Sequence, residues 1–273
     1  MPDPNTPATI ITGAAGGMGA AIAQTFANEG RPLILCDMQA APLESLAASL
    51  TGAASVTIVA GDITAADYPA RIIVALAGRR IAALAHAAGV SPSMTDGKRV
   101  FAINFTATQR LVEALLPHMA SGGAAILIAS NSGHSFAFGF IDRALKKVIR
   151  GRSSLLVSLM LRNSRLAYPM SKRGVQLYAR TMAPAFGKLG ARIVSLSPGI
   201  IDTGMGRREQ SAGPEIDKMI AVTPVGRMGV PGEIASVVAF LASPAASYLC
   251  GTDILVDGGT IAGIEANGGI MKL

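Results

Sequence analysis

Tyr168 and Lys172, in the string YPMSK, stand four positions apart and have side chains that could move a proton. On a helix, residues at this spacing project from the same face, which would place a phenol beside an ammonium group. A free phenol has a pKa of about 10 and is a poor base at neutral pH, but a nearby cation favours the phenolate and lowers that pKa. The pair is therefore a candidate for general acid–base chemistry on a substrate oxygen. The same spacing also occurs on helices with no catalytic role.

A glycine-rich string, TGAAGGMG, spans residues 12–19, between an expected strand and an expected helix. Glycines let the backbone approach a pyrophosphate, and the helix N-terminus supplies N–H donors. The string predicts a phosphate-binding loop; the alternative is a tight turn without a ligand. Asp37 stands at the end of the next strand, where a carboxylate can accept hydrogen bonds from an adenosine ribose and repels a 2′-phosphate. Since the loop contains no Arg or Lys, we expect NAD as the cofactor in preference to NADP.

The elements that must position these residues alternate short apolar runs with helical patterns along almost the whole chain. This alternation is typical of a parallel sheet with crossover helices, and near-continuous apolar strands indicate that both sheet faces are covered. We expect one α/β domain over residues 1–273, with no repeat or linker dividing it. The expected strands are 8–12, 32–36, 55–59, 81–87, 124–130, 191–198 and 253–257, and the expected helices are 17–28, 43–50, 67–77, 100–119, 168–188 and 231–241.

The composition excludes several classes of protein. Half of the residues are hydrophobic and 15% are charged, which is typical of a packed globular chain. No apolar run reaches the roughly 18 residues that a membrane span needs, and the first residues do not form a secretory signal. Two cysteines, Cys36 and Cys250, make neither a disulfide framework nor a metal site. We therefore expect a cytoplasmic protein with no metal site.

Together these features resemble the short-chain dehydrogenase/reductase family, from Ala8 to about Ile264. TGAAGGMG is similar to the family's TGxxxGxG cofactor loop and GDIT to its adenine contact. AHAAG is similar to an Asn-x-Ala-Gly motif, with His86 in place of the usual Asn. INFTA supplies Asn104 at the position of the active-site Asn, although Ala107 stands where Gly is usual. ILIASNSG supplies Ser130 like the catalytic Ser, and SPGIIDT resembles the segment that contacts the nicotinamide carboxamide.

The resemblance implies a single doubly wound Rossmann domain with a seven-stranded parallel sheet. Its activity would be the NAD-dependent interconversion of a secondary alcohol and a ketone. Tyr168 would take the alcohol proton, and Lys172 would lower the pKa of Tyr168 and hold the nicotinamide ribose. Ser130 would bind the substrate oxygen, and Asn104 would anchor a water chain. The implied cofactor contacts are Gly13, Gly17, Met18, Gly19, Asp37, Asp62, Ile63, Ala88, Gly89, Tyr168, Lys172, Pro198, Gly199, Ile201 and Thr203.

Two alternatives remain beside this interpretation. An NAD-binding sensor or scaffold without turnover would keep the glycine-rich loop, but the presence of Asn104, Ser130, Tyr168 and Lys172 together argues against it. His86 could be a base, but we expect a core histidine, because it stands where the family binds cofactor. Family members also pair through their long helices and last strand, so we expect a homodimer or homotetramer.

Ser130 and Tyr168 are 38 positions apart, far more than is usual in the family. The surplus, about residues 134–165, is a basic segment. The net charge of the chain is +7, of which residues 142–165 carry +6 and the remainder +1. Apolar residues in the segment follow the spacing of an amphipathic helix, with Gly151 as a possible break. They are Leu145, Val148, Ile149, Leu155, Leu156, Leu159 and Met160.

The basic segment has three interpretations: a helix packed on the body or a second subunit, a lid over an apolar pocket, or a site for acidic ligands or an anionic membrane surface. It lacks the interleaved aromatics of a nucleic-acid site, so we expect no nucleic-acid partner. A similar insertion occurs in a hydroxysteroid dehydrogenase/carbonyl reductase branch of the family, with strings like LAYPMSK and ASVVAFLASPAASY. That likeness favours a bulky apolar, steroid-like or aromatic small-molecule substrate. Met205, Met219 and Ile220 would form one wall of its pocket, and Phe136 and Phe138 the other.

Overall fold

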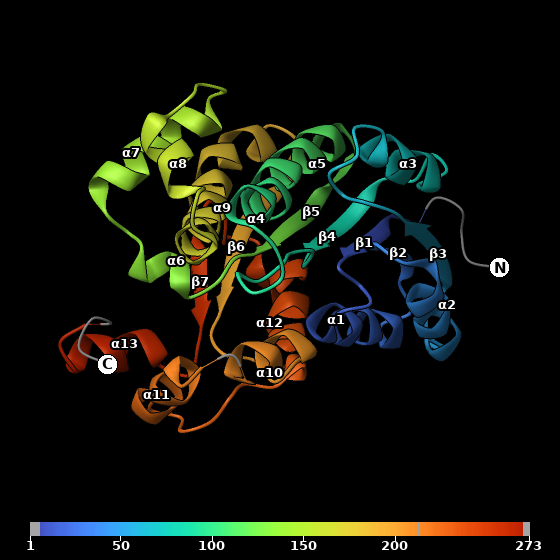
Figure 1. Ribbon diagram of the computed structural model, residues 1–273. Helices are drawn as coiled ribbons and strands as arrows, with labels where there is room; N and C mark the ends of the chain where they lie inside the picture. Colours follow the sequence, from blue (N-terminus) through green and yellow to red (C-terminus); the bar gives the residue numbers. More distant parts are fainter. Residues whose placement is uncertain (1–5, 212, 270–273) are drawn as a thin grey trace.

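Seven short strands form one parallel sheet within residues 6–211 and 213–269, which the computed structural model describes (Figure 1). The order across the sheet is β3-β2-β1-β4-β5-β6-β7. The chain therefore starts in the middle, runs outward to β3, returns to β4 and runs outward again to β7, which places a topological switch point between β1 and β4. This confirms the expected doubly wound sheet. The strands are β1 Ala8–Thr12, β2 Pro32–Asp37, β3 Ser55–Ala60, β4 Ile81–His86, β5 Met119–Ile128, β6 Arg192–Pro198 and β7 Asp253–Val256.

Helices cover both faces of the sheet, as the apolar strands require. On one face α1 (Gly17–Asn28), α2 (Ala40–Ser49) and α12 (Pro231–Ala242) bury Phe26, Leu43 and Val238 against the strands (Figure 1). The other face is covered by α3 (Tyr68–Ala75), α4 (Gly97–Phe101), α5 (Ala107–Leu115) and α9 (Ser164–Gly187). The remaining helices are α6 Ser132–Ser135, α7 Gly139–Ile149, α8 Leu155–Met160, α10 Gly204–Ser211, α11 Glu215–Val222 and α13 Thr260–Ala266, with 3-10 turns at Leu116–His118 and Pro244–Ala246.

The expected helix 100–119 is not continuous. Between α4 and α5 the chain forms a π-helical turn, Ala102–Thr106, and the 3-10 turn Leu116–His118 follows α5. Pro117 has no backbone N–H and ends the α-helix, so β5 starts at Met119, well before the expected residue 124. The same strand ends at Ile128, which leaves Ser130 in the loop beyond it. A π-helical turn often marks a functional site, and this one contains Asn104.

The basic segment, residues 134–165, packs on the body of the protein. Its main helix, α7, lies along α9 (Figure 1), and Arg173 of α9 donates two hydrogen bonds to the Asp142 carboxylate, at 2.8 and 2.7 Å. Gly151, with a φ of 72°, separates α7 from α8, so the expected break is confirmed. No residue of the segment lines the cavity described below, so the lid interpretation is wrong.

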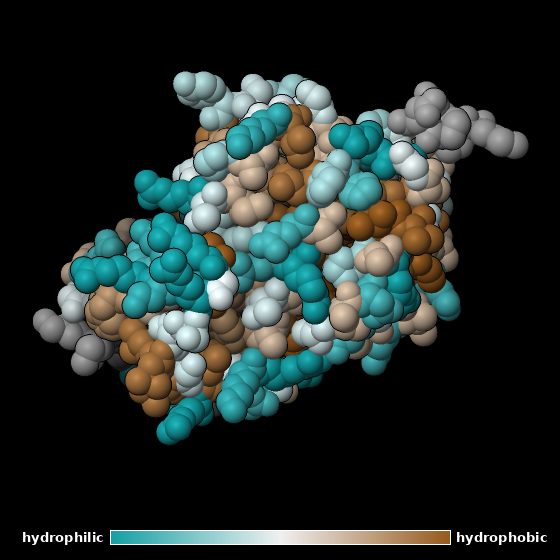
Figure 2. Space-filling view, turned by 90° about the horizontal axis from the view of Figure 1, so that it is seen from above, coloured by the Kyte–Doolittle hydropathy of each residue, from teal (hydrophilic) through white to brown (hydrophobic). Residues whose placement is uncertain are grey.

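The segment's amphipathic pattern is only partly as expected. Ile141, Leu145 and Val157 are buried, but Leu155 and Leu159, which the pattern placed on the packed face, are 77% and 48% exposed. The basic side chains face solvent; they are Arg143, Lys146, Lys147, Arg150, Arg152, Arg162 and Arg165. Figure 2 looks down on the face that is uppermost in Figure 1 and shows hydrophilic side chains interrupted by hydrophobic patches. The segment is therefore a packed, solvated cover on α9.

Candidate active site

A cavity of about 280 Å³ opens at the carboxyl ends of β4, β5 and β6, where α/β sheets bind their ligands. Residues of α9 lie on one side of it, and residues of α10 and α11 on the other. The fold brings together many of the residues expected from the sequence. Those lining the cavity are Met18, Gly89, Ser130, Tyr168, Lys172, Pro198, Gly199, Ile201 and Thr203.

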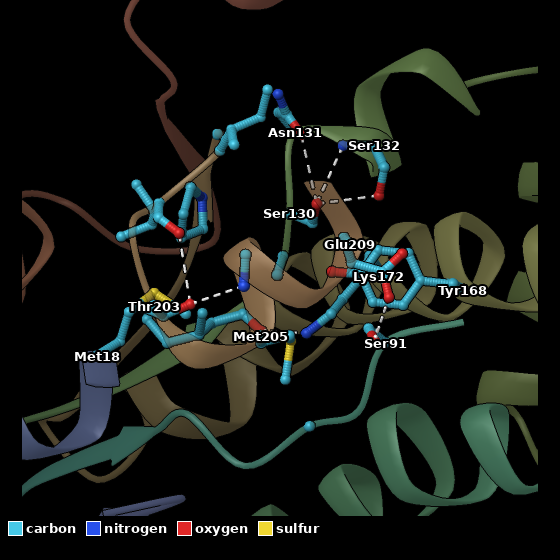
Figure 3. A pocket seen from close by; sticks show the side chains of 18 of the residues that line it. Met18, Ser91, Ser130, Asn131, Ser132, Tyr168, Lys172, Thr203, Met205 and Glu209 are labelled. Carbon is cyan, nitrogen blue, oxygen red and sulfur yellow. Dashed lines mark hydrogen bonds between the residues drawn. The ribbon is translucent and has the colours of Figure 1, made fainter. Parts of the chain in front are cut away.

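Tyr168 and Lys172 point into this cavity from successive turns of α9 (Figure 3). Lys172 Nζ lies 5.9 Å from the centroid of the Tyr168 ring and donates a 3.0 Å hydrogen bond to the carbonyl of Ile128. Burial lowers the pKa of Lys172 to about 8. The strand end therefore holds the ammonium group beside the phenol, as the spacing predicts.

The expected lowering of the Tyr168 pKa is wrong for this arrangement. Burial raises the pKa of Tyr168; the Ser130 hydroxyl opposes this shift, and the negative charge of Glu209 adds to it. Desolvation disfavours the charged phenolate, and a nearby carboxylate disfavours it further. A raised pKa favours the protonated phenol, which suits donation of a proton to a substrate oxygen.

Ser130 follows β5 and is held by its neighbours on the same loop. Its Oγ accepts hydrogen bonds from the backbone N–H and the hydroxyl of Ser132, at 3.2 and 3.0 Å, and donates to Asn131 Oδ1 at 3.4 Å (Figure 3). The carbonyl of Ser130 accepts a 3.3 Å hydrogen bond from Gln176 Nε2. The hydroxyl is therefore fixed at the edge of the cavity, from which it can hydrogen-bond to a substrate oxygen.

Asn104 holds the loop that follows β4. Its side-chain amide donates to the carbonyl of Val90 at 2.9 Å, and its Oδ1 accepts from the Val90 N–H at 2.8 Å. This pair of bonds fixes the loop after β4 at Gly89, where an added Cβ would lie 3.2 Å from Asn104 Oδ1 and 3.5 Å from Lys172 Nζ. Asn104 does not line the cavity, so its structural partners are the β4 loop and the surroundings of Lys172.

The glycine-rich loop has the close backbone approaches that a dinucleotide site needs. A Cβ on Gly19 would lie 2.0 Å from the carbonyl oxygen of Gly13, and a Cβ on Gly17 would lie 2.8 Å from Thr203 Cγ2. Gly13 also has a φ of 66°, which favours glycine. The loop thus faces the segment after β6 across the N-terminus of α1, and this cradle fits a dinucleotide pyrophosphate.

Asp37 lies at the end of β2 against this loop. Its Oδ2 accepts a hydrogen bond from the Ala15 N–H at 2.9 Å, and its Oδ1 accepts from the Met38 N–H at 2.7 Å. Neither the loop nor the two residues after Asp37 contain Arg or Lys. An acid in this place fits a ribose with a free 2′-hydroxyl better than one with a 2′-phosphate.

The other expected cofactor residues lie outside the cavity. Asp62 accepts hydrogen bonds from Thr64 and a 2.5 Å hydrogen bond from Arg99, while the Ile63 side chain is buried in the core. The Ala88 N–H donates to the Thr12 hydroxyl at 3.3 Å. The adenine contact expected of Asp62 and Ile63 stays a prediction.

The structure adds polar residues that the sequence analysis missed. Glu209 of α10 lines the cavity, and its Oε1 accepts hydrogen bonds from Ser91 at 2.6 Å and from Ser93. The Nδ2 of Asn131 is buried and has no hydrogen-bond partner within the described chain. Glu209 stands in the polar run RREQ, and nothing in that run indicated that its side chain would face the cavity. Asn131 directly follows Ser130, and this adjacency could have drawn attention to it.

Of the two walls expected for the substrate pocket, one is largely confirmed and the other is wrong. Met205 and Met219 line the cavity, together with Ile216 in place of Ile220. Phe136 and Phe138 do not line it, because α6 and the following residues turn away toward α9.

His86 is a core histidine, as expected. Its ring nitrogens lie 2.7 Å from the Thr12 hydroxyl and 2.8 Å from the Thr108 hydroxyl, and burial lowers its pKa to about 3. Within the residues described, no group of His, Cys, Asp and Glu side chains could hold a metal ion. None of the described helices is long and apolar enough to cross a membrane.

Known proteins match this chain over nearly its whole length. Residues 7–141 match the family model described as short chain dehydrogenase, and residues 140–260 match the one described as Enoyl-(Acyl carrier protein) reductase. A D-threitol dehydrogenase of Mycolicibacterium smegmatis is 32% identical, with 92% of this chain and 91% of that protein covered. A 3-alpha-hydroxysteroid dehydrogenase/carbonyl reductase of Comamonas testosteroni is 30% identical, with 92% and 95% covered.

Solved structures show the same architecture. A short-chain dehydrogenase/reductase of Brucella melitensis, described as a glucose/ribitol dehydrogenase, superposes with a TM-score of 0.76 at 28% identity, with 94% of this chain and 97% of that chain covered. The crystal structure of BdcA in complex with NADPH superposes with a TM-score of 0.69 at 26% identity, with 92% and 93% covered.

Proposed function

The chain belongs to the short-chain dehydrogenase/reductase family, and from this premise we propose that it is an NAD-dependent enzyme interconverting a secondary alcohol and a ketone. The observation that supports the proposal best is the convergence of Ser130, Tyr168 and Lys172 on one cavity beside the glycine-rich loop. A protein that only sensed the cofactor would not need a hydroxyl, a phenol and an ammonium group around one cavity. The presence of these groups therefore favours turnover over sensing.

When bound, a nicotinamide cofactor would supply or accept the hydride in the proposed reaction. Tyr168 gives its proton to the substrate oxygen during reduction and takes it back during oxidation. Ser130 donates a hydrogen bond to the same oxygen and stabilises the charge that develops on it. Lys172 would hold the nicotinamide ribose, and Asn104 would anchor the water chain that carries the proton to solvent.

The finer choice of cofactor rests on Asp37. A carboxylate at the end of β2, with no Arg or Lys in the glycine-rich loop or in the two residues after Asp37, supports NAD over NADP. The apolar side chains of Met205, Ile216 and Met219 support a bulky apolar substrate. The relatives named above act, by their names, on D-threitol and on a 3-alpha-hydroxysteroid, and both compounds carry a secondary hydroxyl group.

We also propose that the enzyme acts as a homo-oligomer in the cytoplasm. The family's pairing helices correspond to α5 and α9, and α7 packs against α9, so the basic segment would take part in or replace one of these contacts. Its exposed basic face leaves contact with an anionic membrane surface as a second proposal for that segment.

The proposed function is tested by NADH formation from NAD⁺ with a panel of secondary alcohols, with NADP⁺ and Tyr168→Phe run alongside. Turnover with NAD⁺ that disappears in Tyr168→Phe would support the proposal. Binding of NAD⁺ without turnover of any alcohol, or of any matching ketone in the reverse direction, would favour a sensor.

A further inference from the structure

Glu209 is an unexpected charge in a largely apolar cavity. Within the described chain, Lys172 and Glu209 are the only charged side chains that line the cavity. Lys172 points at the strand end that carries Ser130, whereas Glu209 comes from α10 on the opposite side. In Figure 3 the Glu209 carboxylate lies with Ser91 beside Tyr168. Its negative charge also contributes to the raised pKa of Tyr168.

Hydrogen bonds from the described residues reach only one oxygen of the Glu209 carboxylate. Among the residues that the structure describes, Ser91 and Ser93 donate hydrogen bonds to this carboxylate, and both bonds go to Oε1. An ionised carboxylate can accept about four hydrogen bonds, so Oε2 keeps its acceptor capacity. Val90, Met205 and Met219, which also line the cavity, have side chains without a hydrogen-bond donor. A partly desolvated carboxylate in such surroundings is costly unless a donor reaches it.

We propose that Glu209 binds a second hydrogen-bond donor on the substrate, a hydroxyl or an ammonium group close to the reacting carbinol carbon. The proposal rests on the alcohol and ketone chemistry proposed above and narrows its substrate class. The enzyme would act on diols or amino alcohols, with apolar bodies against the methionines, and on the matching ketones. It would reject hydroxy acids, because a substrate carboxylate would be repelled by Glu209. An ammonium group would also neutralise the charge that disfavours the Tyr168 phenolate.

A different role for Glu209 is a latch between α10 and the loop after β4. The Ser91 and Ser93 hydroxyls hold Oε1 from that loop, so the carboxylate would then close the cavity without touching the substrate. Ser93 is exposed and does not line the cavity, which makes Ser93→Ala a matched control. That variant removes one latch bond and leaves the carboxylate in place.

The test uses four compounds that share a cyclohexanol ring. They are cyclohexanol itself and its three derivatives with a hydroxyl, an ammonium or a carboxylate group on the adjacent carbon. A hydrogen bond to a charged group is worth enough to raise kcat/KM for the hydroxyl and ammonium derivatives about 10- to 100-fold over cyclohexanol. The carboxylate derivative should be the poorest substrate. Glu209→Leu should abolish all three differences. Glu209→Gln should keep part of the preference for the hydroxyl and lose that for the ammonium. Ser93→Ala should keep every preference.

The affinities of the same four compounds are measured by calorimetry on Tyr168→Phe with NAD⁺. Differences in affinity among the compounds are then observed without turnover. Turnover of all four at similar rates by the wild-type protein would overturn the inference and leave the proposed function standing. Discrimination in binding without wild-type turnover would support the role of Glu209 and overturn the proposed function. Equal losses on all four substrates in the Glu209 variants, reproduced by Ser93→Ala, would show a latch and overturn the inference.

Discussion

Lys172 and Gln176 stand one turn apart on α9; Lys172 holds the last carbonyl of β5, and Gln176 holds a carbonyl in the loop that follows it. Lys172 Nζ donates to Ile128 at 3.0 Å, and Gln176 Nε2 donates to Ser130 at 3.3 Å. Gln176 also lies so close to the loop that a Cβ on Gly133 would be 2.6 Å from its Nε2. One face of α9 therefore presents Tyr168 to the cavity and fixes the loop that carries Ser130.

The first prediction concerns this clamp. Gln176→Met should lower kcat about tenfold, because a near-isosteric side chain without a donor lets the Ser130 loop shift. The KM for NAD⁺ should be nearly unchanged, since the glycine-rich loop is untouched. Ser197→Ala removes the other acceptor of the Gln176 amide, at 2.9 Å, and should leave kcat near the wild-type value. Equal effects of both variants on kcat would argue against a positioning role for Gln176.

The second prediction concerns Tyr168. Tyr168→Phe should lower kcat by about 10²- to 10⁴-fold, the usual contribution of general acid–base catalysis. NAD⁺ affinity should change little, because the ring remains and only the hydroxyl is lost. Steady-state kinetics and NAD⁺ titration on the same preparation measure both quantities. A variant that kept most of its activity would exclude Tyr168 as the proton donor.

The third prediction concerns the pH dependence of alcohol oxidation. Oxidation needs the phenolate, so its rate should rise with pH toward the pKa of Tyr168, which burial raises above its ordinary value. Glu209 raises this pKa as well, and Glu209→Gln removes a negative charge. The alkaline rise of kcat/KM should therefore move to lower pH in Glu209→Gln. A shift to higher pH, or none, would contradict the electrostatic coupling between the two residues.

The fourth prediction concerns the cofactor. Asp37→Asn keeps an acceptor for the Ala15 N–H but loses the charge that repels a 2′-phosphate. The ratio of kcat/KM for NAD⁺ to that for NADP⁺ should fall roughly tenfold or more, since a bond to a charged group is lost. Kinetics with both cofactors and one alcohol give this ratio. A wild-type protein that prefers NADP⁺ would overturn the assignment of Asp37.

The fifth prediction concerns stability in acid. Burial lowers the pKa of His86 to about 3 in the folded state, from an ordinary value of 6.5. The unfolded chain therefore binds more protons between these values, so stability falls as pH decreases from about 6.5 toward 3, at up to about 1.4 kcal/mol per pH unit. His86→Asn should unfold with a smaller pH dependence in this range. Urea unfolding at several pH values measures it, and an unchanged slope would contradict the assignment.

The sequence predicted most elements to within a few residues. Strand β1 and helix α1 start and end where expected, because an apolar run and a glycine-rich turn define both ends locally. The helix expected over residues 100–119 is interrupted in the structure, since the apolar pattern could not reveal the π-helical turn Ala102–Thr106, which contacts α9. The basic segment gave two helices, but its apolar spacing did not show which leucines would face α9.

The sequence by itself determined the sheet, the glycine-rich loop and the Tyr168/Lys172 pair, because these follow from local periodicity, glycine geometry and i, i+4 spacing. Only the tertiary structure decided what surrounds the phenol. Burial and the charge of Glu209, 41 positions away in the chain, raise the pKa of Tyr168, whereas the sequence predicted that Lys172 would lower it. Desolvation and charge pairing depend on distances in space, and the direction in which α10 folds over the cavity is set by packing between elements that no local pattern records.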